Sequence, residues 1–98
     1  MTLNTPDRWV VVTITTATES IDKVFAGWYG GFVGGDSWQL SSGIVETEQH
    51  DDCLIFVNRS GSRYRCYKSA HGISGYMRTV LENWLTDPDV KVHIHDKF

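Results

Sequence analysis

Long apolar runs, cysteine and positive charge are all scarce in this 98-residue chain. It has no run of 18 hydrophobic residues, so we expect no segment that spans a membrane. The first eight residues contain no basic stretch followed by an apolar core, and we therefore expect no secretory signal. With only two cysteines and no such signal, we expect reduced thiols and a cytoplasmic protein.

The net charge of -3 at pH 7 argues against some classes of function. A dedicated duplex-DNA binder needs a basic footprint to neutralise phosphates, so this charge argues against one. The glycine-rich residues 27–35 are not a phosphate loop, because they lack a terminal Gly-Lys-Ser/Thr and no helix opens after them. We find no catalytic or cofactor motif, and we expect a protein that is not an enzyme and uses no cofactor or metal.

What the chain does contain is enough apolar material for one core. Hydrophobic residues make up 41% of it, close to the average of globular domains, and four tryptophans are many for this length. We expect a single domain over residues 1–98. Residues 1–7 are polar and include a proline, which predicts a loose terminus.

The clearest structural pattern is a β-hairpin formed by residues 53–57 and 63–67, which flank a polar turn. A turn at residues 58–61 would place Cys53 opposite Cys66, where a disulfide could form. A turn at residues 60–61 would place Ile55 opposite Cys66 instead. In both registers the same side chains share one face, which we expect to be the buried one. These are Cys53, Ile55, Val57, Tyr64 and Cys66.

Three further strands are expected before the hairpin and one near the end of the chain. β-Branched residues dominate residues 9–16, with apolar side chains on both faces, which predicts a strand central in its sheet. Residues 22–29 and 38–48 predict two more strands, and Ser42-Gly43 indicates a bulge or bend within the second. Apolar and polar residues alternate over residues 90–94, which predicts a short last strand.

After the hairpin the apolar period becomes helical. Large apolar residues recur at three- and four-residue spacing between residues 73 and 85, which predicts an amphipathic helix. Ser74 is suited to cap its N-terminus, and Pro88 predicts a stop near Thr86. Together the elements predict an α+β fold: a mostly antiparallel sheet of five to six strands, with one amphipathic helix in the C-terminal half packed on one face.

The first candidate binding site is the tip of the glycine-rich segment. Glycine lets a partner approach the backbone closely, and aromatic side chains dominate binding hot spots. The candidates are Trp28, Tyr29, Phe32 and Val33. We expect core packing for Trp28 and also for Trp38, and exposure for Phe32 and Val33.

The second candidate site is basic and lies on the hairpin. It comprises Arg59, Arg63, Arg65 and Tyr67, which could bind an anion or stack on bases. Acidic residues at positions 46–52 are close in sequence, and we therefore favour solvated charges that these acids balance.

A third pattern, His93-x-His95, puts two imidazoles on one face of the last strand and could begin a metal site. Such a site needs a third ligand, for which His50 and His71 are candidates. Nothing in the sequence brings either of them to the last strand, so we favour a solvated edge strand.

Residues 38–44 (Trp-Gln-Leu-Ser-Ser-Gly-Ile) and 60–66 (Ser-Gly-Ser-Arg-Tyr-Arg-Cys) resemble segments of small uncharacterised phage- and prophage-encoded bacterial proteins. The resemblance carries over no site residue. It implies a bacterial or phage cytosol and a protein that acts by binding a host protein.

The sequence therefore favours a small non-enzymatic protein-binding domain, an interaction or inhibitor module. Its partner would be another protein or a second copy of the chain, and we expect no membrane partner. Edge strands offer one route to such a partner, by strand addition. The alternative is a nucleic-acid or anionic-ligand binding module that uses the basic hairpin.

Overall fold

Two four-stranded sheets and one α-helix make up the part of the chain that the computed structural model describes, residues 3–30 and 35–96. The first sheet has the strand order β4-β3-β2-β8, and the second has the order β1-β7-β6-β5. Neighbouring strands are antiparallel except β1 and β7, which are parallel. The elements are β1 (Leu3–Asn4), β2 (Arg8–Thr15), β3 (Ser20–Trp28), β4 (Ser37–Leu40), β5 (Ile44–Gln49), β6 (Cys53–Asn58), β7 (Arg63–Tyr67), a short 3-10 turn (Lys68–Ala70), α1 (Gly75–Leu85) and β8 (Lys91–His95).

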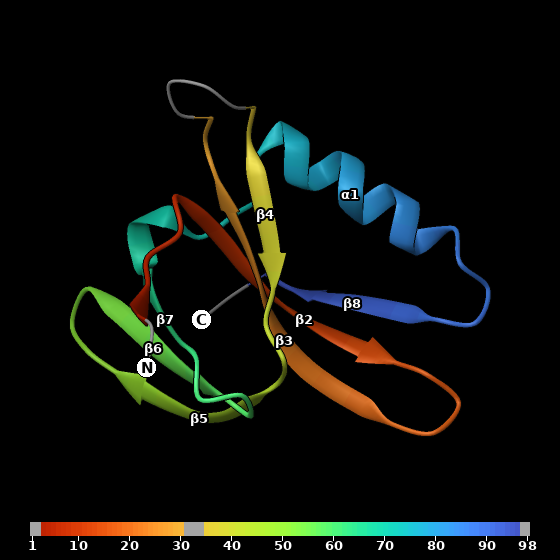
Figure 1. The fold of residues 1–98 in the computed structure, drawn as a ribbon, viewed down its shortest axis with the longest axis horizontal. Coiled ribbons are helices and arrows are strands. Elements are labelled where there is room, and N and C mark those ends of the chain that lie inside the picture. The colour runs from red at the N-terminus through yellow and green to blue at the C-terminus, as the bar shows by residue number, and fades with distance from the viewer. Residues whose placement is uncertain (1–2, 31–34, 97–98) are drawn as a thin grey trace.

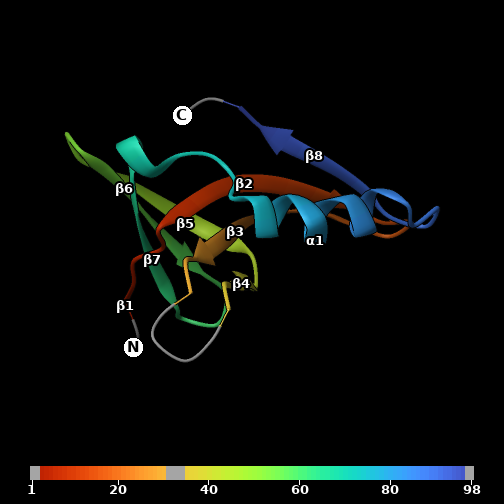
Figure 2. The same ribbon diagram turned by 90° about the horizontal axis from the view of Figure 1, so that it is seen from above.

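The molecule has three layers, with the first sheet in the middle. Figure 1 shows α1 on one side of the long strands β2 and β3 and the second sheet on the other, and Figure 2 shows the same arrangement from above. The predicted α+β class, with mostly antiparallel strands and one helix, is confirmed for the described residues. The prediction of a single sheet of five to six strands is wrong, because eight strands divide into two sheets.

Alternation along β2 and β3 explains why the middle sheet is covered on both faces. Side chains of successive strand residues point to opposite faces. Thus Val10, Val12 and Phe25 pack against the helix, whereas their sequence neighbours pack against the second sheet. The latter cluster joins Trp9, Val11, Val24 and Ala26 to Leu54, Phe56, Tyr64 and Cys66. As predicted, β2 is central, with β3 on one side and β8 on the other.

The helix lies where the sequence predicts it. Ser74 is the N-cap, and its hydroxyl accepts a hydrogen bond from the Met77 N–H at 3.2 Å. Thr86 is the C-cap, two residues before Pro88. Met77 and Leu81 are the buried side chains of α1, and burying such a side chain stabilises a fold by about 1.5–3 kcal/mol.

The hairpin of β6 and β7 is confirmed, but both predicted registers are wrong. The Asn58 N–H donates to the Ser62 carbonyl at 3.0 Å, and the turn between them has three residues, with Gly61 at φ 90°. A three-residue turn with its last residue at positive φ is a common hairpin connection. Both predicted turns have an even number of residues, and an odd turn moves every partner by one position, which changes the face of β6 that is buried beside Tyr64 and Cys66.

The shift separates the two cysteines. Cys66 lies opposite Leu54 and Cys53 lies opposite Tyr67, on the other face of the sheet. Tyr64 and Cys66 are buried as predicted, but Leu54 and Phe56 share their face in place of Ile55 and Val57. Cys53 is buried as well, on the other face. Both cysteines are free, so the disulfide that was left open does not form in this structure.

The predicted strand at residues 38–48 is two strands in different sheets. β4 ends at Leu40, and β5 begins at Ile44 in the second sheet. The β3–β4 ladder ends at Ser41, where a side chain replaces a backbone group as acceptor: the Ser41 hydroxyl accepts the Val24 N–H at 2.8 Å. Gly43, at φ 145°, then redirects the chain. The bend expected at Ser42-Gly43 is thus the crossing point between the sheets.

Part of the segment expected to be loose is ordered into the second sheet. Leu3 and Asn4 form β1 and pair with Arg63 and Tyr64 of β7, and Pro6 is buried. In the described residues, no helix is both long enough and apolar enough to cross a membrane.

Candidate functional site

The free edge of β4 is the most distinctive open surface of the described structure. β4 is the first strand of the order β4-β3-β2-β8, and within the described residues it pairs only with β3. In Figure 1 it passes in front of β2 and β3. Its residues are Ser37, Trp38, Gln39 and Leu40, none of which is charged.

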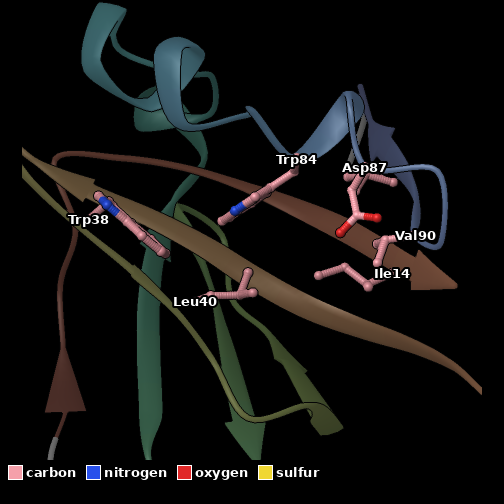
Figure 3. Close-up of a pocket in the computed structure, with 7 residues that line it drawn as sticks. Ile14, Trp38, Leu40, Trp84, Asp87 and Val90 are labelled. Carbon is pink, nitrogen blue, oxygen red and sulfur yellow. The ribbon is translucent and has the colours of Figure 1, made fainter. Parts of the chain in front are cut away.

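One face of β4 borders an apolar pocket of about 240 Å³ between the sheet and the C-terminal end of α1. Trp38 and Trp84 form one end of it, with ring centroids 5.4 Å apart and planes at 74°. Asp87 lies at the other end, near Ile14 and Val90 (Figure 3). The full lining comprises Ile14, Trp38, Leu40, Trp84, Asp87, Val90 and Val92.

The other face of β4 borders a polar pocket of about 460 Å³. Leu40 lines both pockets, whereas Gln39 and Lys23 line only this one of the two. The Tyr64 hydroxyl donates to Gln39 Oε1 at 3.1 Å. Burial, and to a smaller extent the Cys66 thiol, raises the pKa of Tyr64, so the hydroxyl stays protonated as a donor. The lining comprises Asn4, Lys23, Gln39, Leu40, Ser41, Ser42, Ser60, Ser62 and Tyr64.

The residues predicted at the glycine-rich tip are only partly described. Phe32 and Val33 lie outside the described residues. Trp28 is half-buried against the core, as expected, and its Nε1 donates to the Thr5 carbonyl at 3.0 Å. Tyr29 is 52% exposed, and its hydroxyl accepts from Arg8 Nε at 3.1 Å. The expectation that Trp38 is a core residue is wrong in part, because 38% of it is exposed.

The predicted basic group is divided by the fold. Arg63, Arg65 and Tyr67 share the outer face of the second sheet, where they lie opposite Val57, Ile55 and Cys53. Arg63 Nη2 lies 3.3 Å from Glu48 Oε2, so an acid of the neighbouring strand balances its charge. Arg59 belongs to the turn instead, and its N–H donates to the Gly43 carbonyl at 2.9 Å.

The two histidines of β8 lie side by side, with ring centroids 4.9 Å apart. His95 Nε2 lies 2.7 Å from Thr13 Oγ1, which donates to Asp22 Oδ1 at 2.6 Å. Among residues 3–30 and 35–96, no group of three or more His, Cys, Asp or Glu side chains could hold a metal ion. His50 directly follows β5 of the second sheet, and its Nε2 lies 3.6 Å from Glu48 Oε1.

Comparison with protein-family models, with curated proteins and with solved structures finds no match to this chain. The geometry of the residues alone therefore carries the argument about function.

The pocket residues were missed in the sequence because they come from four separate elements, β2, β4, α1 and β8, and from the loop between the last two. Trp84 was assigned to the core face of the helix, and Trp38 was expected to pack in the core at the start of the strand 38–48. Asp87 stands in the short segment between α1 and β8, where only its neighbour Pro88 gave a signal, and that signal concerned the end of the helix. The Ser42-Gly43 bend was the one feature that pointed to this edge.

Proposed function

We propose that this chain is a small non-enzymatic domain that binds an extended segment of another protein along the free edge of β4. The observation that carries the proposal is the pair of pockets on the two faces of this edge strand. A strand added to a sheet gains affinity from main-chain hydrogen bonds and specificity from pockets for alternate side chains. An apolar pocket on one face and a polar pocket on the other match that alternation.

The other sheet edges carry features that discourage pairing. Natural proteins protect edge strands with charge, bulges or short length. β5 carries Glu46 and Glu48 and has a register irregularity between Ile44 and Glu46. β8 carries one lysine and two histidines, and β1 has only two residues. Of these edges, the uncharged β4 is therefore the one best suited to receive a partner strand.

The backbone of β4 also presents bonding groups outward. The Ser41 N–H donates to the Val24 carbonyl at 2.9 Å, so Ser41 and Gln39 direct their backbone groups toward β3. Bonding direction alternates along a strand, which leaves the N–H and C=O of Trp38 and Leu40 pointing away from β3. These are the groups that an added strand would meet.

The test selects binders from a library of random twelve-residue peptides displayed on phage, and then examines one selected peptide in solution. We expect amide hydrogen exchange at Trp38 and Leu40 to slow when the peptide binds, while exchange at Gln39 changes little. We also expect Trp38→Lys to weaken the peptide at least tenfold, because a lysine on an edge blocks pairing. The matched control is Val45→Lys on the β5 edge, where Val45 is 62% exposed.

Unchanged exchange at Trp38 and Leu40 in the presence of bound peptide would overturn the proposal, and this result does not depend on any variant. Equal effects of Trp38→Lys and Val45→Lys, in variants with native amide spectra, would overturn it as well. Pairing of β4 with β4 of a second copy would appear as protection of the same amides without peptide, and it would replace the partner protein by the chain itself.

The alternative, a nucleic-acid or anionic-ligand module on the basic hairpin, stays a prediction. Electrostatic binding to several phosphates weakens steeply with salt, whereas the main-chain hydrogen bonds of strand addition depend little on it. Binding of a single-stranded oligonucleotide that Arg65→Ala abolishes would favour the alternative. The host-protein partner that the resemblance to phage proteins implies also stays a prediction.

A further inference from the structure

The apolar pocket beside β4 ends in two indole rings that are open to solvent on one side. Trp38 comes from the edge strand and Trp84 from the last turn of α1. Phe25 supports both rings from the sheet, with its centroid 4.8 Å from Trp84 and 5.9 Å from Trp38. Figure 3 shows both indoles projecting toward the same space above Leu40. Their faces carry the negative part of the ring quadrupole, which attracts cations.

The opposite end of the pocket is negatively charged. Of the described residues that line it, only Asp87 is charged, and its carboxylate points toward Ile14 and Val90 in Figure 3. The loop fixes this orientation, because Asp87 Oδ1 accepts the Asp89 N–H at 2.9 Å.

The end of α1 adds to this negative charge. The C-terminus of a helix carries partial negative charge, which basic residues of the last turn often balance. The last turn of α1 has no basic residue. The carboxylate and the helix end are thus two sources of negative potential at one end of an apolar space.

We propose that this pocket binds an aliphatic chain that ends in a cation, namely a lysine or arginine side chain of the partner segment. This rests on the proposed function, since Trp38 and Leu40 belong to the strand that the segment would pair with. The stem packs on Leu40, Val92 and the indoles, and the cation lies toward Asp87. A volume of about 240 Å³ is below the roughly 300–1,000 Å³ of sites for drug-sized ligands, and it suits one side chain.

The test uses three probes with the same six-carbon stem: hexylammonium, hexanol and hexanoate. The readout is the indole N–H signals of Trp38 and Trp84 in a proton–nitrogen NMR spectrum, assigned with Trp38→Phe and Trp84→Phe. We expect hexylammonium to shift both signals and to bind roughly tenfold more tightly than hexanol, with hexanoate the weakest. The signal of Trp9, which is fully buried, should not move.

The matched variants are Asp87→Asn and Asp89→Asn. Each removes one negative charge from the same loop, and Asp87→Asn keeps an oxygen that can accept the Asp89 N–H. Asp87→Asn should abolish the preference for hexylammonium over hexanol, and Asp89→Asn should retain it. Equal binding of hexylammonium and hexanol to the native chain, or an unchanged preference in Asp87→Asn, would overturn the inference.

Failure of this inference can be told from failure of the proposed function. If a selected peptide protects the β4 amides but hexylammonium binds no more tightly than hexanol, strand addition at β4 is supported and the cation pocket is refuted. If hexylammonium shows the Asp87-dependent preference but no peptide protects β4, the pocket binds a cationic chain and the strand-addition function falls.

Discussion

A single added methyl group at Gly27 tests the contact between α1 and the middle sheet. A Cβ built on Gly27 would lie 2.8 Å from Met77 Cγ and closer still to Sδ, and Met77 is fully buried. Overpacking of this kind lowers the free energy of unfolding by about 1–3 kcal/mol. Replacing glycine also restricts the unfolded chain, which raises the free energy of unfolding by about 0.4–1 kcal/mol. Gly27→Ala should therefore lower the free energy of unfolding by about 1–2 kcal/mol in urea unfolding followed by circular dichroism.

A double-mutant cycle assigns that cost to Met77. Met77→Ala alone should cost about 2–5 kcal/mol, because it leaves a cavity. In that background the Gly27 methyl group has room, so Gly27→Ala should cost nothing or stabilise, and the coupling should be at least about 1 kcal/mol. The control is Gly75→Ala, where a Cβ would meet nothing within 4 Å. If Gly27→Ala costs the same within about 0.5 kcal/mol in both backgrounds, the packing argument is refuted.

Two further predictions concern the helix cap and a buried thiol. Ser74→Ala should lower the free energy of unfolding by about 1 kcal/mol in the same urea assay, because the Met77 N–H loses its acceptor. Ser74→Asp should restore most of this loss. An unchanged urea midpoint in Ser74→Ala would contradict the assigned cap. Burial between the sheets raises the pKa of Cys66, so the thiol stabilises the fold fully below the pKa of about 8.5 of the unfolded chain. Above that pH the unfolded state binds fewer protons than the native state, and stability should fall by up to about 1.4 kcal/mol per pH unit. Cys66→Ala should reduce this slope in urea midpoints measured between pH 8 and 10, and an equal slope in the variant would contradict the assignment.

Local patterns were sufficient to predict most elements of the fold. The β-branched run at residues 9–16 predicts β2 and its central place, and the spacing around Met77 and Leu81 predicts α1. Ser74 and Pro88 predict its ends, because capping and proline geometry act within one helical turn. These signals succeed because the interactions that determine them are close in sequence.

The register of the hairpin could not be predicted, because one residue more or less in the turn changes which residues of β6 and β7 lie opposite each other. The two turns weighed from the sequence were both even, whereas the observed turn is odd and buries the opposite face of β6 against the same face of β7. The outcome depends on Asn58, which is buried and donates from Nδ2 to the carbonyls of Phe56 and Ser62. A buried asparagine is not expected from composition or periodicity.

The division of residues 38–48 into two strands creates both the fold and the candidate site. If they formed one strand, β4 would continue beside β3, and a longer ladder would replace the polar pocket. Instead the Ser41 hydroxyl accepts the Val24 N–H, which in a continuing ladder would bond to the Ser41 carbonyl, and the chain leaves the sheet through Gly43. A side chain at Gly43 would meet Ile21 at 3.1 Å and Arg59 at 3.2 Å, in addition to the strain of its positive φ. The glycine that lets the second sheet form therefore also ends β4 beside the polar pocket, and it leaves the outer edge of this strand open to a partner.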